Sequence, residues 1–215
     1  MKEIFPGIFS EGGKLYTKSL VGGSVYGEMV IKRNGNEYRE WIPERSKLAA
    51  AILNGMRNNP INEKSIILYL GAANGTTVSH ISDITSGGFI YAIEFSERAM
   101  RKLLKICEKR KNIMPILADA RKPEEYYFIE SVDVIYCDIA QPDETEIAIR
   151  NANEFLKKDG YLMIAIKSQS IDVTKEPKDV YEEEKEKLEK SNFKVLELID
   201  LEPYERDHCM IISKL

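Results

Sequence analysis

Cysteine, histidine and glutamine are scarce in this sequence of 215 residues. The three cysteines lie far apart, and only two histidines, His80 and His208, could join them around a metal ion. This distribution predicts neither a structural zinc site nor a disulfide framework, so we expect no bound metal. The two glutamines contrast with abundant lysine and glutamate, a composition found in many thermophile proteins.

Long apolar runs are missing as well. No stretch approaches the ~20 consecutive apolar residues of a membrane span. The opening residues, MKEIFP, lack the apolar core of a secretory signal. We therefore expect a cytoplasmic protein without a membrane partner.

A strong basic excess is also absent, since the net charge is −4. Residues 1–60 hold nine lysines and arginines against six acidic residues, whereas residues 61–215 hold 22 against 29. A protein that binds RNA alone usually carries more positive charge. If the substrate is a nucleic acid, partner molecules should supply much of the binding.

Short β-strands are expected in the first 41 residues, at 7–10, at 14–20 and on either side of Asn34 and Gly35. Asn-Gly between two alternating segments is a strong signal for a two-residue hairpin turn. A helix should follow from Lys47 to Gly55, with Ser46 as its N-cap. The sequence thus predicts a small N-terminal β module with its lead-in helix over 1–55 and a larger domain over 56–215.

The larger domain alternates between apolar runs and amphipathic segments, which is the pattern of a parallel sheet with helical crossovers. The runs are nearly continuous, as expected for strands that are covered on both faces. The expected strands are 65–70, 89–94, 113–118, 132–138 and 160–166, and the expected helices are 76–85, 97–110 and 144–157.

The last part of the chain is expected to be a charged helix, at about 177–191, and two strands, Phe193–Leu201 and Cys209–Lys214. The connection between these strands is too short for a crossover, so they should pair as an antiparallel hairpin. The α/β, Rossmann-like, seven-stranded sheet that results is the layout of the Class I S-adenosylmethionine methyltransferases. A dehydrogenase would instead continue with another βαβ half.

The turn after the first parallel strand holds Gly71 and Gly75, and a helix opens at Thr76 and Thr77. Glycine lets the backbone approach a ligand closely, as at the nucleotide-type cofactor sites of doubly wound sheets. The same spacing occurs in helix caps and tight turns, so the pattern alone leaves both interpretations open.

Two further strand ends carry candidate cofactor contacts. Glu94 could accept hydrogen bonds from ribose hydroxyls, or it could be an exposed loop carboxylate. Phe95 could lie against an adenine ring or cover the core. Asp119 and Ala120 follow the third strand, where they are placed to meet an adenine amino group.

Asp138 and Lys167 close the fourth and fifth strands, so both share the sheet edge with the glycine turn. A lysine at the end of an apolar strand is uncommon without a partner, and we expect Asp138 to be that partner. The pair would be a structural ion pair, or it would orient and deprotonate a hydroxyl, with Lys167 shifted toward neutrality. His208 and Lys47 are weak candidates when taken singly, and His80 is expected to be a packed or rim residue.

Several segments together resemble the fibrillarin family of RNA 2'-O-methyltransferases. They are WIPERSKLAAA at 41–51, YLGAANGTTVSHISD at 69–83, YAIEFS at 91–96, DIAQPD at 138–143 and LEPYERDH at 201–208. The resemblance covers nearly the whole chain. Asn74 stands where the family often has a small residue such as serine, and it remains compatible with the turn.

The resemblance implies S-adenosylmethionine as cofactor and a catalytic tetrad for 2'-O-methyl transfer. The implied tetrad is Lys47, Asp138, Lys167 and His208. The implied cofactor-binding residues are Gly71, Ala73, Thr76, Thr77, Glu94, Phe95, Asp119, Ala120, Asp138, Ile139, Ala140 and Gln141.

The resemblance also implies the catalytic subunit of a box C/D guide ribonucleoprotein, which methylates guide-selected nucleotides of rRNA and tRNA. Its implied partners are a Nop-domain scaffold protein, a kink-turn-binding ribosomal-type protein and the box C/D guide RNA. The sequence shows no Gly/Arg-rich N-terminal extension, so it resembles archaeal members. Methylation of a protein side chain, or a non-catalytic assembly role in an RNA-protein particle, are the alternatives.

Overall fold

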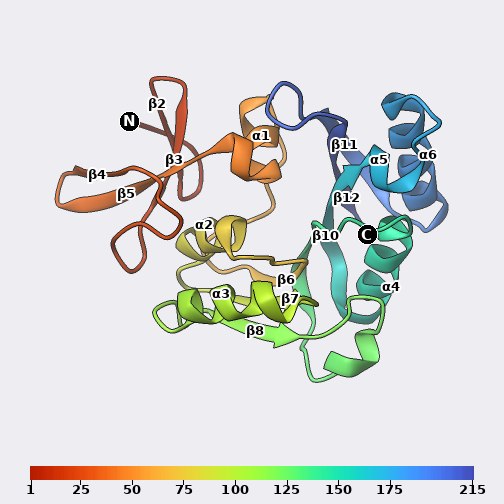
Figure 1. Cartoon of the computed structure of the whole chain (residues 1–215), viewed down its shortest axis with the longest axis horizontal. Coiled ribbons are helices and arrows are strands. Elements are labelled where there is room, and N and C mark those ends of the chain that lie inside the picture. Colours follow the sequence, from red (N-terminus) through yellow and green to blue (C-terminus); the bar gives the residue numbers. More distant parts are fainter.

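A computed structural model describes all residues from Met1 to Leu215 and shows a small antiparallel sheet beside a larger mixed sheet (Figure 1). The small sheet has the strand order β1-β2-β3-β5-β4. This confirms the expected N-terminal β module and adds the strand β1, which the sequence pattern did not indicate. The strands are β1 (Lys2–Phe5), β2 (Ile8–Glu11), β3 (Lys14–Lys18), β4 (Val30–Arg33) and β5 (Asn36–Trp41).

The predicted hairpin turn joins β4 to β5. Asn34 and Gly35 both have positive φ, at 49° and 77°. A two-residue turn with φ > 0 at both positions matches the twist of the flanking strands, and asparagine and glycine tolerate that conformation best. The local sequence therefore suffices to place this hairpin.

The large sheet has seven strands in the order β11-β12-β10-β9-β6-β7-β8. Strand β12 runs antiparallel to both of its neighbours, and the other pairings are parallel, which confirms the predicted terminal hairpin. The strands are β6 (Ile66–Leu70), β7 (Phe89–Glu94), β8 (Ile113–Leu117), β9 (Val132–Cys137), β10 (Leu156–Lys167), β11 (Lys194–Asp200) and β12 (His208–Lys214).

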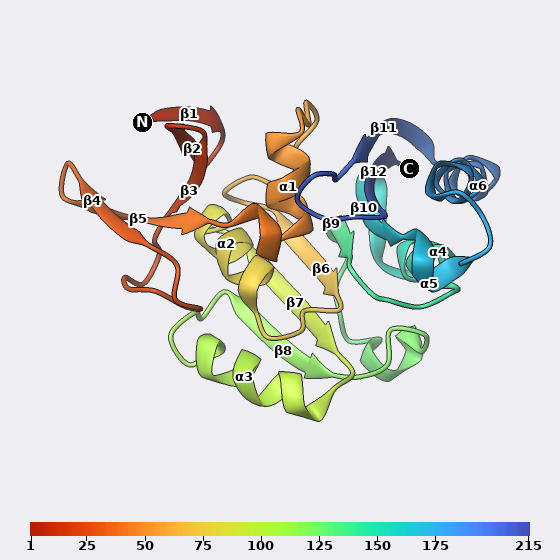
Figure 2. The ribbon, with the colours of Figure 1, turned by 45° about the horizontal axis from the view of Figure 1, so that its top comes forward.

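Helices cover both faces of the large sheet (Figure 2). The apolar residues of α1, α2 and α3 join one buried cluster of 29 residues, which also takes in Ile8, Leu15 and Trp41 of the small sheet. Those of α4 and α6 join a second cluster of 22 residues on the other face. The helices are η1 (Pro43–Arg45), α1 (Lys47–Leu53), α2 (Thr76–Ile84), α3 (Glu97–Cys107), η2 (Pro123–Tyr126), α4 (Glu144–Phe155), α5 (Ser168–Ile171) and α6 (Pro177–Lys190).

The boundary between α4 and β10 differs from the prediction. The helix was expected to run to residue 157, but it ends at Phe155, and β10 begins at the next residue. Asp159, with φ at 63°, makes the irregular turn that lets Leu156 and Tyr161 both pair with β9. The proposed division of the chain at residue 55 stays a prediction, because the buried cluster of 29 residues contains residues from both sides of that position.

A buried polar cluster ties the small sheet to α2. The Asp83 carboxylate accepts hydrogen bonds from Arg39 Nη1 at 2.8 Å, Arg110 Nη1 at 2.6 Å and Thr17 Oγ1 at 2.8 Å. The ring of His80 bonds Thr17 and Tyr26 and stacks on Trp41 at 4.9 Å, so His80 is a packed residue as expected. No helix of the chain has the length and apolarity to cross a membrane.

Candidate functional site

The carboxyl ends of β6, β7, β8 and β9 surround a cavity of about 280 Å³. Ligands of open α/β sheets bind outside the carboxyl ends of the strands, at the point where the strand order reverses. In this sheet the order reverses between β6 and β9. The lining includes ten of the predicted cofactor residues, namely Gly71, Ala73, Glu94, Phe95, Asp119, Ala120, Asp138, Ile139, Ala140 and Gln141.

Gly71 is required by the geometry of this edge. Its φ is 83°, and a Cβ there would overlap the carbonyl oxygen of Asp138. Its N–H donates to Ile93 at 3.0 Å, while the Asp138 N–H donates to Leu70 at 2.9 Å. The turn can therefore lie against two neighbouring strand ends only because position 71 has no side chain.

The Glu94 carboxylate is held rigidly at the cavity wall. Its Oε2 accepts the Ala73 N–H at 2.7 Å and its Oε1 accepts the Ser96 N–H at 2.7 Å, and the residue is only 8% exposed. Each oxygen keeps a further lone pair for a ligand hydroxyl. Phe95 beside it is 74% exposed, so its ring presents a free face to the cavity.

Arg121 also lines the cavity, although the sequence analysis did not single it out. Its Nη2 donates to the Gln141 side chain and, at 3.4 Å, to Asp143, and its backbone N–H donates to Asp119 at 3.0 Å. Arg121 thus joins the loops after β8 and β9. The only sequence signal for it was a cation beside the Asp119-Ala120 pair.

Thr76 and Thr77 lie outside this cavity. Thr76 lines a neighbouring groove, and the buried Thr77 hydroxyl donates to the Ser46 side chain at 3.0 Å. Ser46 also caps α1 by accepting from Ala49. Thr77 therefore helps position the start of α1, which carries Lys47.

Asp138 pairs with Lys47 and not with Lys167, which corrects the sequence-based expectation. Lys47 Nζ lies 2.7 Å from Asp138 Oδ1, and both side chains are 20% exposed. The reason is the register of β9 against β10. Cys137 pairs with Ile164, so Asp138 is level with Ala165, two residues before Lys167. Burial alone would lower the pKa of Lys47, but attraction to Asp138, and more weakly to Glu205 and Glu144, outweighs it and raises the pKa.

His208 lies directly opposite Lys167 across the pairing of β10 with β12. His208 Nδ1 is 2.6 Å from the Arg206 carbonyl oxygen, which can only accept, so in the neutral ring Nδ1 carries the proton and Nε2 does not. Burial and the charges of Lys47 and Lys167 lower the pKa of His208, so its ring is neutral at pH 7.

The β11–β12 loop brings His208 to the other candidates. Asn54, just after α1, donates its side-chain N–H groups to the carbonyls of Asp200 and Glu202 at 2.7 and 2.8 Å. Both ribbon views show this loop beside α1 (Figures 1 and 2). The structure therefore gathers Lys47, Asp138, Lys167 and His208 into one group, of which Asp138 lines the cavity.

Glu144 is a buried acid behind this group, and sequence reasoning did not find it. Its Oε1 accepts the Lys167 backbone N–H at 3.1 Å, and its Oε2 has no hydrogen-bond partner. Burial raises the pKa of Glu144 to about 9, and the nearby charges of Asp138 and Glu184 add to the effect. Glu144 is therefore a neutral acid at pH 7 that fixes the backbone of Lys167.

Replacing Glu144 by glutamine should flatten the pH dependence of stability. The folded protein keeps this proton up to about pH 9, whereas the ordinary pKa is 4.5. Between these values the folded state binds more protons, so rising pH lowers the free energy of unfolding, by roughly 3 kcal/mol at pH 7. Thermal unfolding at pH 5 and pH 8 should show a smaller loss of stability for Glu144→Gln than for wild type. The exposed Glu154→Gln on the same helix is the control, and equal losses in all three proteins would contradict the assignment.

The comparisons with known proteins agree with this geometry. The family model described as Fibrillarin matches residues 1–215. A Methanocaldococcus jannaschii protein named fibrillarin-like rRNA/tRNA 2'-O-methyltransferase is 53% identical, over 99% of this chain and 96% of its own.

Two solved structures are similar over most of the chain, and they confirm the predicted methyltransferase fold. Aeropyrum pernix fibrillarin, in complex with natively bound S-adenosyl-L-methionine, has a TM-score of 0.87 and 49% identity, over 93% of this chain and 88% of that one. A fibrillarin/Nop5p complex has a TM-score of 0.90 and 46% identity, over 99% of each chain. Similarity at this level, from the first residue to the last, shows that the protein belongs to the fibrillarin family.

Proposed function

We propose that this protein is an S-adenosylmethionine-dependent RNA 2'-O-methyltransferase that acts on guide-selected nucleotides of rRNA and tRNA. The observation that carries the proposal is the meeting of Lys47, Asp138, Lys167 and His208 beside the cavity. Relatives named as rRNA/tRNA 2'-O-methyltransferases support the reaction, and the fibrillarin with bound S-adenosyl-L-methionine supports the cofactor.

The cavity fits this cofactor by its chemistry. Glu94 offers fixed acceptors for two ribose hydroxyls, and Phe95 offers an exposed ring for the adenine. Asp119 and Gln141 add polar groups at the adenine end, while Ile93, Ile139 and Ile147 give apolar walls. When bound, the cofactor supplies an electrophilic methyl group on a sulfonium.

The four polar side chains prepare the attacking hydroxyl. Lys47 Nζ donates a hydrogen bond to Asp138 Oδ1. The other oxygen, Oδ2, makes no hydrogen bond within the chain, so Oδ2 can accept the proton of a ribose 2'-hydroxyl. The raised pKa of Lys47 keeps its ammonium charged, which favours the negative charge that develops on the ribose oxygen. Lys167 and neutral His208 lie opposite each other in the pairing of β10 with β12, where they orient the hydroxyl for in-line transfer.

The proposed function includes assembly into a ribonucleoprotein particle. A Nop-domain scaffold protein is the best supported partner, because a fibrillarin/Nop5p complex is among the similar structures. A box C/D guide RNA and a kink-turn-binding protein complete the proposed assembly, and the net charge of −4 fits a subunit that depends on partners to hold RNA.

One assay tests the function and its rivals. Transfer of labelled methyl groups is measured on RNA with matched and mismatched guides, with and without the scaffold proteins. Guide-dependent labelling at a single ribose is expected. Labelling of protein would instead favour a protein methyltransferase, labelling of RNA without a matched guide would exclude guided selection, and no labelling in any mixture would favour an assembly role.

Replacing Glu94 by glutamine should weaken S-adenosylmethionine binding about 10- to 100-fold, since hydrogen bonds to a charged group contribute ~1.5–3 kcal/mol. Isothermal titration calorimetry measures the change. The matched control is Glu97→Gln on α3, an exposed acid outside the cavity. A dissociation constant equal to that of the control would remove Glu94 from the site.

A further inference from the structure

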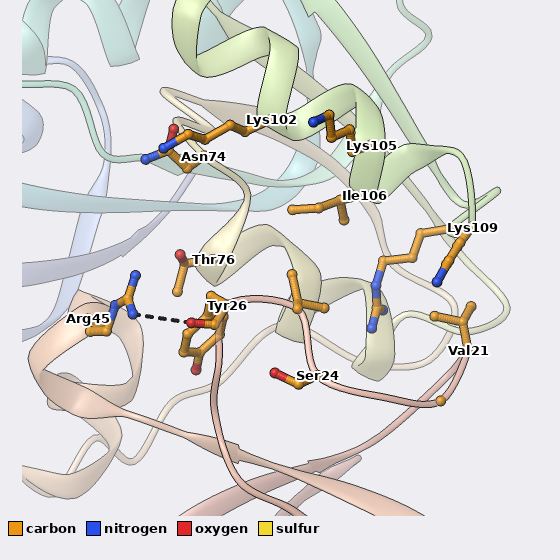
Figure 3. A pocket seen from close by; sticks show the side chains of 13 residues that line it. Val21, Ser24, Tyr26, Arg45, Asn74, Thr76, Lys102, Lys105, Ile106 and Lys109 are labelled. Carbon is orange, nitrogen blue, oxygen red and sulfur yellow. Dashed lines mark hydrogen bonds between the residues drawn. The ribbon is translucent and has the colours of Figure 1, made fainter.

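A second cavity, of about 450 Å³, lies between α3 and the 19–29 loop that joins β3 to β4. Five cations line it and no acidic residue does. They come from three separate segments: Arg45 from η1, Lys102 and Lys105 from α3, and Lys109 and Arg110 from the turn after it (Figure 3). We call this cavity the basic groove.

The cations of the basic groove are largely uncompensated. Arg45, Lys102, Lys105 and Lys109 form no ion pair within the chain. The buried Arg110 binds Asp83 through Nη1, but its Nη2 has no partner. On α6, by contrast, Lys185, Lys187 and Lys190 are each paired with glutamates. A concentration of unpaired positive charge in a groove attracts a polyanion.

The lining favours contact with phosphates over contact with bases. Tyr26 is the only aromatic residue in the groove, and the Arg45 guanidinium lies 4.9 Å from its ring centroid. Base recognition on single strands relies on free aromatic faces, whereas lysines and arginines contact the backbone without reading sequence. The groove therefore suits a ligand whose sequence varies.

The groove leads toward the catalytic group. Figure 3 shows Arg45 and Asn74 at one end and Val21 and Lys109 at the other. Arg45 precedes Lys47 by two residues, and Asn74 belongs to the glycine turn. Lys102 and Lys105 lie three residues apart on α3, so both reach the groove from the same face of the helix.

We propose that the basic groove binds the phosphodiester backbone of the RNA beside the nucleotide to be methylated. The inference rests on the proposed RNA 2'-O-methyltransferase function and adds the surface that guides the strand to the catalytic group. Contacts to backbone alone suit an enzyme whose target is chosen by a separate guide.

The test neutralises Lys102, Lys105 and Lys109 together by replacement with glutamine. The control, Lys178→Gln, Lys185→Gln and Lys190→Gln on α6, makes the same change in charge on an element away from the groove (Figure 2). Binding of the full chain to a synthetic guide–substrate RNA duplex is measured over a series of salt concentrations. The groove variant should bind RNA at least about tenfold more weakly near 0.1 M salt. The slope of log K against log salt, which is negative, should decrease in magnitude by up to about three.

Three outcomes would overturn the inference: equal slopes for the groove variant and the α6 control, no RNA binding by the wild-type chain at low salt, or displacement of RNA by equimolar inorganic pyrophosphate. The last would mark a small-anion site. S-adenosylmethionine affinity, measured in parallel, should be unchanged in both variants.

This binding experiment, together with the methyl-transfer assay described above, separates this inference from the proposed function. Methyl transfer by the wild-type chain with normal binding by the groove variant would reject the groove and keep the function. Weakened binding by the groove variant without any wild-type methyl transfer to RNA would keep the groove as an RNA-binding surface and reject the function.

Discussion

Asp138→Asn is expected to lower the rate of methyl transfer about 10²- to 10⁴-fold, the usual contribution of a positioned proton acceptor. Asparagine keeps the size of the side chain but removes the charge that holds Lys47 at 2.7 Å. It also cannot take the proton of the ribose hydroxyl. Single-turnover transfer to RNA at saturating cofactor measures the loss directly.

Cofactor binding separates this chemical role from a structural one. Asp138 also lines the cavity, so the dissociation constant for S-adenosylmethionine should be measured for the same variant and is expected to change by less than about tenfold. Lys167→Ala, outside the cavity lining, should abolish transfer with cofactor affinity unchanged. If either variant loses cofactor affinity and transfer in equal proportion, its side chain acts on binding and not on the hydroxyl.

Asp83→Ala is expected to lower the free energy of unfolding by at least about 3–5 kcal/mol, the cost of leaving a buried charge without its partner. The change would leave Arg110, which is 1% exposed, without a carboxylate, whereas Arg39, which is 0% exposed, would keep its ion pair with Glu28. It would also release the Thr17 hydroxyl and the Leu20 N–H. Thermal unfolding should shift down by roughly 6 to 20 °C for a chain of this size.

The matched control is Glu186→Ala on α6, where both partners of the ion pair with Lys190 are mostly exposed. Surface changes of this kind stay within about 0.5 kcal/mol. An Asp83→Ala protein as stable as this control would show that the cluster does not hold the small sheet against α2.

The order of strands and helices was predictable because each signal is local. Apolar runs of strand length can bury both faces only under crossover helices. Seven residues, 201–207, cannot cross over a sheet, so the last two strands had to form a hairpin. Strand β1 escaped prediction because three of its four residues are exposed and give no apolar alternation.

The candidate site was predictable in its members but not in its contacts. Strand ends placed Glu94, Asp119, Asp138 and Lys167 at one sheet edge, and the family resemblance added Lys47 and His208. The sequence could not assign the roles of Glu144 and Arg121, because these roles depend on which backbone and side-chain atoms lie beside them after folding.

By itself, the sequence determined the two sheets, the terminal hairpin and the edge at which a cofactor should lie, because periodicity and loop length act along the chain. Only the tertiary structure decided that Asp138 pairs with Lys47, since the register of β9 against β10 leaves Asp138 two residues short of Lys167. It also decided that Thr77 supports Ser46 and that cations from three segments form one groove. Such contacts join residues far apart in sequence, so their distances exist only after the helices pack on the sheet.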